Sequence, residues 1–255
     1  MAYVADACCA ENYTTEEFIE EISEKVDSNV LSLFHVNIRS IKNKFEDLAE
    51  YLEELQHKFA VIGITETWQS EYDMEGYRAV HLRRNPGKVG GGISIYVRDD
   101  LPFRCFRKTD FTKVNSDIEC RFIEFNRKHL RIDVNVVVGV IYRPPGSITN
   151  FSDQLSEILD TLQKPSNVLR FIYLMGDFNV TQGGVVMRML DSRNMERLIL
   201  CPTRSERKPD KVLDGIFSSE PRDLAGILDC HKKKIKSDHR PIFAIDQTNG
   251  FNAKR

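Results

Sequence analysis

The hydrophobic residues of this chain fall into short continuous runs and into stretches where they recur every three or four positions. The short runs have the length of buried strands, and one segment alternates charged and apolar residues as a half-exposed strand does. The predicted strands cover residues 30–36, 59–65, 93–97, 118–125, 132–141, 171–175, 212–217 and 242–245. The periodic stretches predict helices at 41–56, 150–162 and 184–193. Many short strands with few helices between them predict an α/β fold, a two-sheet sandwich flanked by helices.

The same pattern divides the chain into one main domain and two short ends. We expect the domain to run from about residue 30 to 247, with a C-terminal tail at 248–255. Residues 1–29 form an N-terminal arm in which Thr14 and the glutamates after it begin a short acidic helix. The sequence leaves open whether this arm is mobile or packs on the domain.

Composition narrows the class of protein. The chain has 255 residues and a formal net charge of -2, so its net charge does not indicate a nucleic-acid partner. A local basic patch is still compatible with that net charge. It contains no apolar run of about 18 residues, so we expect no membrane partner. No signal peptide is apparent, and the six cysteines form no CxxC pair, which predicts an intracellular protein without a zinc site.

The most informative stretch is the predicted strand that leads into Gly176, Asp177, Phe178 and Asn179. Residues two apart at a strand end point to the same side, so Asp177 and Asn179 would stand together while Phe178 turns into the core. A carboxylate beside an amide can orient a water molecule or stabilise an oxyanion. The alternative is a strand that ends in an ordinary Asx turn.

Other predicted strand ends and loops also finish in polar groups suited to phosphate and metal chemistry. These groups are Asn37, Glu66, Tyr142, Asp214, Asp238 and His239. Each has a simpler interpretation as a turn residue, helix cap or exposed strand end, because short motifs often arise by chance. Their number argues for convergence on one site. Carboxylates suit Mg²⁺, and a histidine oriented by a buried carboxylate such as Asp214 is a natural proton carrier, so we expect phosphoester hydrolysis by water.

Seven segments together resemble the endonuclease/exonuclease/phosphatase superfamily, and more closely the apurinic-like endonuclease domains of non-LTR retrotransposons. The segments are HVNIRS at 35–40, ITETW at 64–68, GGI at 91–93, IYRPP at 141–145, GDFN at 176–179, LDGIF at 213–217 and SDHRP at 237–241. The resemblance implies a four-layered α/β sandwich of the DNase I type with two mixed sheets. It also implies a metal-dependent nick in double-stranded DNA that leaves a 3′-OH to prime reverse transcription.

The resemblance assigns a role to each matching position. Glu66 is the expected chief ligand of Mg²⁺, with Mn²⁺ as an alternative ion, and Asn37 and Asp238 are expected to assist it. Asp177 orients or activates water, Asn179 holds phosphate or that water, and Tyr142 contacts the scissile phosphate. His239, oriented by Asp214, is the general acid/base or stabilises the phosphate. Ser237 and Thr203 are expected to touch phosphate or the DNA backbone.

Basic side chains near these positions are candidates for binding DNA phosphates. They are Arg143, Lys232, Lys233 and Lys234, and the lysines directly precede Asp238 and His239. A solubilising charged surface is the alternative. The resemblance further implies that the chain is the nuclease portion of a longer polyprotein with a reverse transcriptase, or a remnant of one, and that it acts in the nucleus.

Two other functions fit the same fold. A phosphatase of small or lipid phosphoesters would share the site chemistry, and an inactive remnant would only bind nucleic acid. The forms of the IYRPP and SDHRP segments favour the transposon branch over a phosphatase. The completeness of the residue set argues against an inactive remnant.

Overall fold

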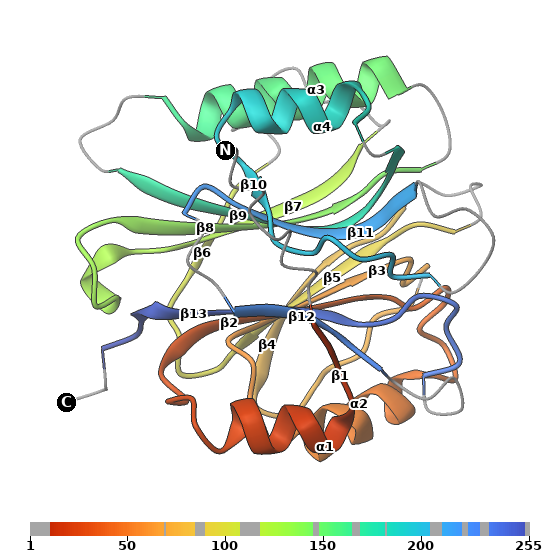
Figure 1. The fold of residues 1–255 in the computed structure, drawn as a ribbon, viewed down its shortest axis with the longest axis vertical. Coiled ribbons are helices and arrows are strands. Elements are labelled where there is room, and N and C mark those ends of the chain that lie inside the picture. The colour runs from red at the N-terminus through yellow and green to blue at the C-terminus, as the bar shows by residue number, and fades with distance from the viewer. Residues whose placement is uncertain are drawn as a thin grey trace, which may run out of the picture.

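Two β-sheets packed face to face form the centre of the molecule, and helices cover their outer faces (Figure 1). The computed structural model describes residues 11–68, 70–84, 90–107, 118–144, 148–164, 169–181, 183–204, 211–220, 224–229 and 235–252. In Figure 1, α3 and α4 lie above one sheet while α1 and α2 lie below the other. This arrangement confirms the predicted four-layered sandwich.

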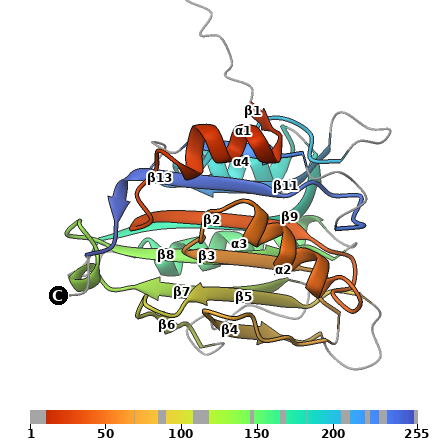
Figure 2. The same ribbon diagram turned by 90° about the horizontal axis from the view of Figure 1, so that it is seen from below.

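The first sheet has seven strands in the order β1-β12-β13-β2-β3-β5-β4. The bounds of its strands are β1 Glu11–Tyr13, β2 Val30–Asn37, β3 Val61–Thr65, β4 Tyr77–Leu82, β5 Ile93–Arg98, β12 Leu224–Leu228 and β13 Ile242–Gly250. β2 and β3 are parallel, and β13 and β5 run antiparallel to them on either side. Figure 2 shows α1 (Thr15–Phe18) and α2 (Phe45–Glu54) across the outer face of this sheet.

The second sheet has six strands in the order β10-β11-β9-β8-β7-β6. The bounds of its strands are β6 Arg104–Cys105, β7 Glu119–Phe125, β8 Asn135–Tyr142, β9 Arg170–Thr181, β10 Glu196–Arg197 and β11 Lys211–Ser218. β8 and β9 are parallel, and β11 is antiparallel to β9. Its outer face carries α3 (Ile148–Leu162) and α4 (Val185–Ser192).

Alternation along the strands divides the apolar side chains among three layers of core. In β9, Met175 packs between the two sheets, whereas its neighbour Leu174 packs under the helices of the second sheet. The period of two along a strand explains this division. The sheets approach so closely at Gly63 of β3 that an added Cβ would lie 2.8 Å from atoms of Met175 and Val140 in the other sheet.

The N-terminal segment packs on the domain from Glu11 onward. β1 adds to the edge of the first sheet, beside β12, and Thr14 and Glu17 form the reciprocal cap that begins α1. The helix continues as a π-helical turn, η1 (Ile19–Ser23), and Phe18 and Ile22 are fully buried against the sheet. At the other end β13 extends past residue 247 to Gly250, and the next residue, Phe251, is also buried.

One predicted helix begins later in the structure than expected. The helix expected at 41–56 is shorter, because the backbone of Ser40 is left-handed with φ 74° and its N–H donates to the carbonyl of Glu66. Lys44 occupies the position before the first turn of α2, so the helix begins at Phe45. None of the helices in the described ranges is both long enough and apolar enough to cross a membrane.

Candidate functional site

Three neighbouring strands of the second sheet place Tyr142, Asp177 and Asp214 side by side. Tyr142 at the end of β8 is in register with Asp177 of β9, and Asp177 is in register with Asp214 of β11. Residues paired in this way project from the same face of a sheet. In the first sheet, Asn37 ends β2, and Glu66 directly follows β3. The two sheets therefore bring their polar strand ends to one place.

Gly176 lets the chain place Asp177 at this point. A Cβ at Gly176 would lie 1.8 Å from the carbonyl oxygen of Ile141, so only glycine lets β9 approach β8 this closely. The sequence predicted that the strand ends at this point. In the structure it continues to Thr181. Phe178 points away from the site as predicted. Its ring packs edge to face on that of Phe217, with 4.8 Å between the ring centroids.

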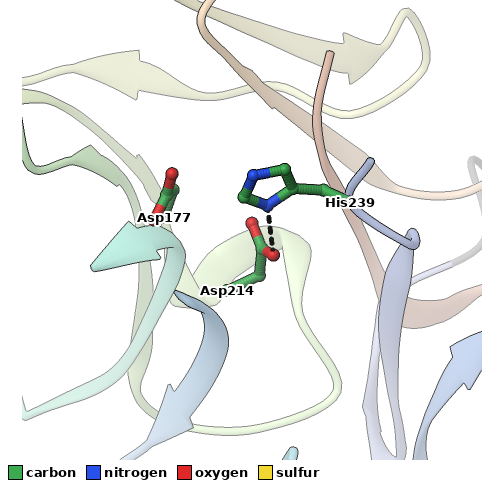
Figure 3. Close-up of side chains that lie close together, drawn as sticks. All are labelled: Asp177, Asp214 and His239. Atoms are coloured by element: carbon green, nitrogen blue, oxygen red, sulfur yellow. Dashed lines mark hydrogen bonds and ion pairs between the residues drawn. The ribbon is translucent and has the colours of Figure 1, made fainter. Parts of the chain in front are cut away.

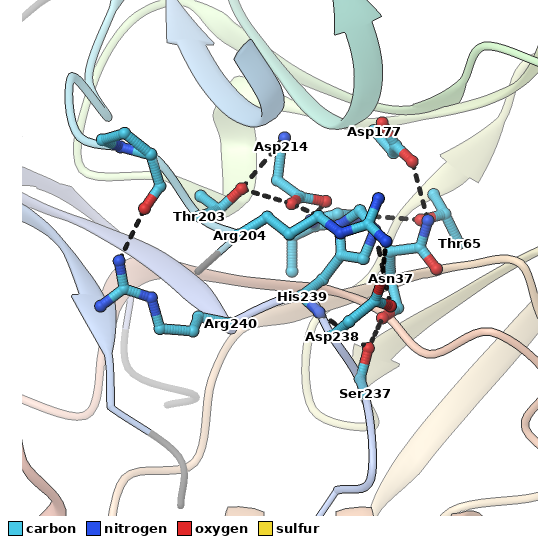
Figure 4. A network of polar contacts seen from close by, with 12 residues as sticks. Asn37, Thr65, Asp177, Thr203, Arg204, Asp214, Ser237, Asp238, His239 and Arg240 are labelled. Atoms are coloured by element: carbon cyan, nitrogen blue, oxygen red, sulfur yellow. Dashed lines mark hydrogen bonds and ion pairs between the residues drawn. The ribbon is translucent and has the colours of Figure 1, made fainter. Parts of the chain in front are cut away.

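The carboxamide of Asn37 links the two sheets at the site (Figure 4). Its Nδ2 donates to Oδ2 of Asp177 at 2.8 Å and to Oε1 of Glu66 at 3.0 Å. Its Oδ1 accepts the backbone N–H of Arg39 at 3.1 Å, which fixes the orientation of the amide. Asn37 is completely buried, so these bonds are shielded from competing water. One amide thus aligns two carboxylates from different sheets.

His239 and Asp214 form a buried pair beside Asp177 (Figure 3). Nδ1 of His239 lies 2.7 Å from Oδ2 of Asp214. The hydroxyl of Thr203 donates to the same carboxylate oxygen at 2.6 Å. This bond and the burial of Thr203 do not suit the predicted contact with phosphate, because the hydroxyl is used to hold Asp214. The pair resembles the histidine–carboxylate unit in which the acid fixes the ring and stabilises its charge.

Burial and mutual charge set the protonation of this cluster. Burial alone lowers the pKa of His239, but the charge and hydrogen bond of Asp214 outweigh it and raise the pKa to about 9. Burial and the negative charge of Asp214 raise the pKa of Asp177 to about 7, against the opposing effects of His239 and Asn37. Burial also acts to raise the pKa of Asp214, but His239 outweighs it and keeps that pKa low. Near neutral pH the arrangement is an imidazolium–carboxylate pair next to a carboxyl that exchanges protons.

Three carboxylate oxygens at the site lack hydrogen-bond partners within the described part of the chain. They are buried Oδ1 atoms of Asp177, Asp214 and Asp238. Asp177, Asp214 and His239 also present potential ligand atoms within 4.8 Å of one another. The unpaired Oδ1 of Asp177, which Asn37 links to Glu66, fits a hard cation or its bound water, because Mg²⁺ prefers oxygen ligands. His239 does not suit this role while it is protonated.

The loop that carries His239 is tied to β2. Ser237 donates its hydroxyl hydrogen to the carbonyl of Asn37 at 2.6 Å and accepts the backbone N–H of His239 at 3.2 Å. Asp238 pairs with Nη1 of Arg39 at 3.0 Å and with the guanidinium of Arg204. In this arrangement Ser237 holds the loop, and Asp238 holds two partly exposed arginines.

The remaining predicted residues surround this centre. Tyr142 is largely buried, and its burial raises the pKa of the hydroxyl. Arg143 is also buried and donates Nη1 to the carbonyl of Asn179 at 2.8 Å, so it braces β9. Asn179 is half-buried and has a left-handed φ of 45°, and its neighbours Phe178 and Val180 both pack under the helices of the second sheet. Lys232, Lys233 and Lys234 lie outside the described residues.

Strained backbone gathers around these residues. Among the described non-glycine residues with positive φ are Arg39, Ser40, Glu66, Trp68 and Asn179. Such conformations persist only where surrounding contacts hold them, and they concentrate at functional sites. Glu66 has φ 56°, and the neighbouring backbone bond from Ser40 to its carbonyl helps to fix it.

Several contributors were not singled out from the sequence. His35 is fully buried, with Nδ1 3.9 Å from Oδ1 of Asp214 and Nε2 3.2 Å from the hydroxyl of Thr65. Its burial lowers its pKa to about 4, so it is neutral near pH 7. The available signal was its place two residues before Asn37, which puts both side chains on one face of β2. Nothing in the sequence indicated that Arg39 and Arg204 both form ion pairs with Asp238.

Comparisons with known proteins agree with this geometry. Residues 34–239 match the Endonuclease/Exonuclease/phosphatase family. The endonuclease domain of TRAS1, a telomere-specific non-LTR retrotransposon, is similar with TM-score 0.61 and 18% identity over 86% of this chain and 98% of that one. The Leishmania major AP endonuclease LMAP gives TM-score 0.62 and 14% identity, covering 92% and 95% of the two chains.

A third solved structure extends the likeness. The catalytic domain of Xenopus laevis APE2 gives TM-score 0.62 and 14% identity over 88% of this chain and 94% of that one. No curated protein is similar enough in sequence to count as a match. At these identities the structural likeness establishes the fold, and the chemistry rests on the site itself.

Proposed function

Because the chain belongs to the endonuclease/exonuclease/phosphatase family, we propose that it is a divalent-metal-dependent endonuclease that nicks double-stranded DNA. The observation that carries the proposal is that the buried amide of Asn37 links Asp177 to Glu66, while the His239–Asp214 pair lies directly beside Asp177. This set holds a proton donor, a proton acceptor and a metal-binding carboxylate in one place. Phosphodiester hydrolysis by water needs these three capacities.

Glu66 is the residue best placed to bind the metal. Its carboxylate is only half-buried, and Asn37 fixes its orientation through Oε1. Asn37 turns its amide nitrogen toward the carboxylates, so it serves chiefly to align them. Asp238 is engaged by two arginines and is the weaker candidate for a ligand. Mg²⁺, or Mn²⁺ in its place, would neutralise charge on the scissile phosphate.

The acid and base roles follow from the protonation states. Asp177, with a pKa near 7, can orient the attacking water and accept its proton at Oδ1, the oxygen that Asn37 leaves unbonded. His239 carries positive charge near neutral pH and can stabilise the phosphate or donate a proton to the leaving oxygen. Tyr142 lies in register with Asp177, which supports the proposal that it contacts the phosphate. Asn179, two residues after Asp177, and Ser237, which holds the loop of His239, are the remaining residues proposed to lie around the phosphate.

The biological setting is the finer part of the proposal. A nick that leaves a 3′-OH provides a primer end for reverse transcription at an insertion site. The seven sequence segments and the likeness to the endonuclease domain of TRAS1 support this role. On this view the chain works in the nucleus as the nuclease portion of a longer polyprotein, or as a remnant of one. Arg143 and the Lys232, Lys233 and Lys234 cluster are candidates for phosphate contacts that assist DNA binding.

Plasmid nicking tests the proposal directly. Supercoiled plasmid should be converted to the open circle with Mg²⁺ and should remain intact with EDTA. Glu66→Gln and His239→Ala should each lose most of the rate, whereas Asp246→Asn, a change to a buried aspartate outside this site, should keep it. An unchanged rate in both site variants would defeat the assignment. Release of phosphate from small phosphoesters without nicking would instead identify a phosphatase, and binding without turnover would identify an inactive remnant.

A further inference from the structure

A single tryptophan stands beside the proposed metal ligand. Among the described residues, the large apolar side chains that remain exposed are Trp68, Leu169, Val185 and Leu200. Trp68 is 38% exposed and is the only tryptophan in the chain. It follows Glu66 by two positions, a separation of at most about 7 Å along the backbone. Its significance comes from its place next to Glu66, since a single exposed apolar side chain is ordinary by itself.

The backbone holds Trp68 in a conformation that bulky residues rarely adopt. Its φ is 61°, and its N–H donates to the carbonyl of Gly91 at 2.7 Å. Thr67 makes the parallel bond to the carbonyl of Gly92 at 3.3 Å. A Cβ at Gly92 would lie 2.6 Å from the carbonyl oxygen of Trp68, so this glycine is required for the close approach. The GGI segment therefore serves to present this loop.

A cationic side chain lies in the same neighbourhood as the indole, because both approach Gly90. A methyl group added at Gly90 would lie 3.8 Å from Nε1 of Trp68 and 3.7 Å from Nη1 of Arg84. Arg84 is in turn held by Glu119, with Nε 3.1 Å from Oε1. An aromatic face beside a fixed guanidinium has the chemistry that binds a nucleobase and its adjoining phosphate.

We infer that Trp68 stacks on a nucleobase of the bound DNA strand close to the cleaved bond. The inference rests on the proposed function and specifies its substrate. A backbone separation of at most about 7 Å from Glu66 corresponds to no more than about two base steps of one DNA strand. The faces of paired bases are covered by their neighbours in a duplex, so the stacked base is one that is unpaired or turned out of the helix. The preferred substrate is DNA whose base stacking is already disturbed at the cleavage position.

Tryptophan fluorescence provides a test that does not depend on cleavage. Because Trp68 is the only tryptophan, selectively excited emission reports on this ring alone. The full chain is titrated, in EDTA, with a short single-stranded oligonucleotide and with a sugar-phosphate strand of equal length that lacks all bases. We expect quenching by the oligonucleotide and little change with the abasic strand. Equal responses to both strands, or no response to either, would overturn the inference.

Nicking kinetics provide the second test. For a duplex with one unpaired base, Trp68→Leu should raise KM about 5- to 100-fold, the range expected for loss of one stacked base. Trp68→Phe should recover part of that loss, because it restores a ring. Leu169→Ala, which removes another exposed apolar side chain just before β9 begins, should leave KM unchanged. A Trp68→Leu enzyme with the KM of the parent would overturn the inference.

The two proposals can fail separately. Plasmid nicking without base-dependent quenching would leave the endonuclease assignment standing and remove the role of Trp68. Base-dependent quenching without nicking would keep the stacking surface and remove the catalytic assignment. If an unrelated protein quenched the fluorescence of Trp68 and the oligonucleotide did not, Trp68 would be a protein-docking residue. That result would also overturn the inference.

Discussion

Replacing Asp214 with asparagine tests the electrostatic account of the site. The carboxylate of Asp214 and its hydrogen bond are the main reasons that the pKa of His239 is raised from 6.5 to about 9. A shift of about 2.5 units corresponds to about 3 kcal/mol of preferential stabilisation of the protonated ring. Asp214→Asn keeps the shape and the contact with Thr203 but removes the charge. Burial then leaves His239 neutral near pH 7.

The sign of the pH dependence follows from the raised pKa. A group whose pKa is higher in the folded state stabilises the protein fully below its unfolded pKa, and this contribution disappears as the pH rises through about 9. At about pH 6 the variant should therefore lose about 3 kcal/mol of unfolding free energy. At about pH 10, where His239 is neutral in both proteins, the difference should shrink or change sign, because the parent then keeps an unpaired buried carboxylate.

Urea denaturation at the two pH values measures this difference. Asp246→Asn is the matched control, because Asp246 is also buried but accepts hydrogen bonds from Tyr173 and Asn249. Its loss of stability should be similar at both pH values. If Asp214→Asn also destabilises the protein equally at both, the pairing with His239 does not account for its stability and the reasoning is wrong.

Three further changes probe the surroundings of the site. Gly176→Ala should destabilise the fold by more than about 4 kcal/mol in urea, because its Cβ would overlap the carbonyl of Ile141, and near-parental stability would contradict the close approach of β8 and β9. Phe178→Ala should cost about 3–5 kcal/mol in the same assay through the cavity left against Phe217, and a loss below about 1 kcal/mol would contradict its buried packing. Asn37→Ala should move the acid limb of the pH–rate profile to higher pH, because it removes a hydrogen bond that opposes the burial-driven rise in the pKa of Asp177. An unmoved limb would show that this hydrogen bond does not set the pKa of Asp177.

Much of the fold was predictable because its strands are buried on both faces. Runs that are mainly or wholly apolar, such as 30–36 and 171–175, identify such strands directly. The strands that were missed gave weaker signals. β1 is only three residues long, and β12 consists of a short segment with a glycine in its middle. The start of α2 was placed too early because the sequence does not reveal the left-handed backbone at Ser40.

The site was predictable where its residues sit on strands and unpredictable where loops meet. Asp177 and Asp214 follow from strand position and polarity, and the structure pairs them across β9 and β11. The contact of Arg39 with Asp238 spans 199 positions, and nothing local to either residue specifies it. Thr203 shows the same limit. Its motif suggested a contact with phosphate, but its hydroxyl faces Asp214 because of how two separate loops fold together.

The amide of Asn37 makes the proposed chemistry depend on the alignment of two independent layers. Its bond to Asp177 crosses from β2 of one sheet to β9 of the other at the candidate site. A lateral slip of about an ångström between the layers would lengthen that bond beyond useful range while leaving every strand intact. Heating should therefore abolish turnover at a lower temperature than it melts secondary structure, and a ligand that clamps the layers together should raise the temperature limit of activity without adding to the core.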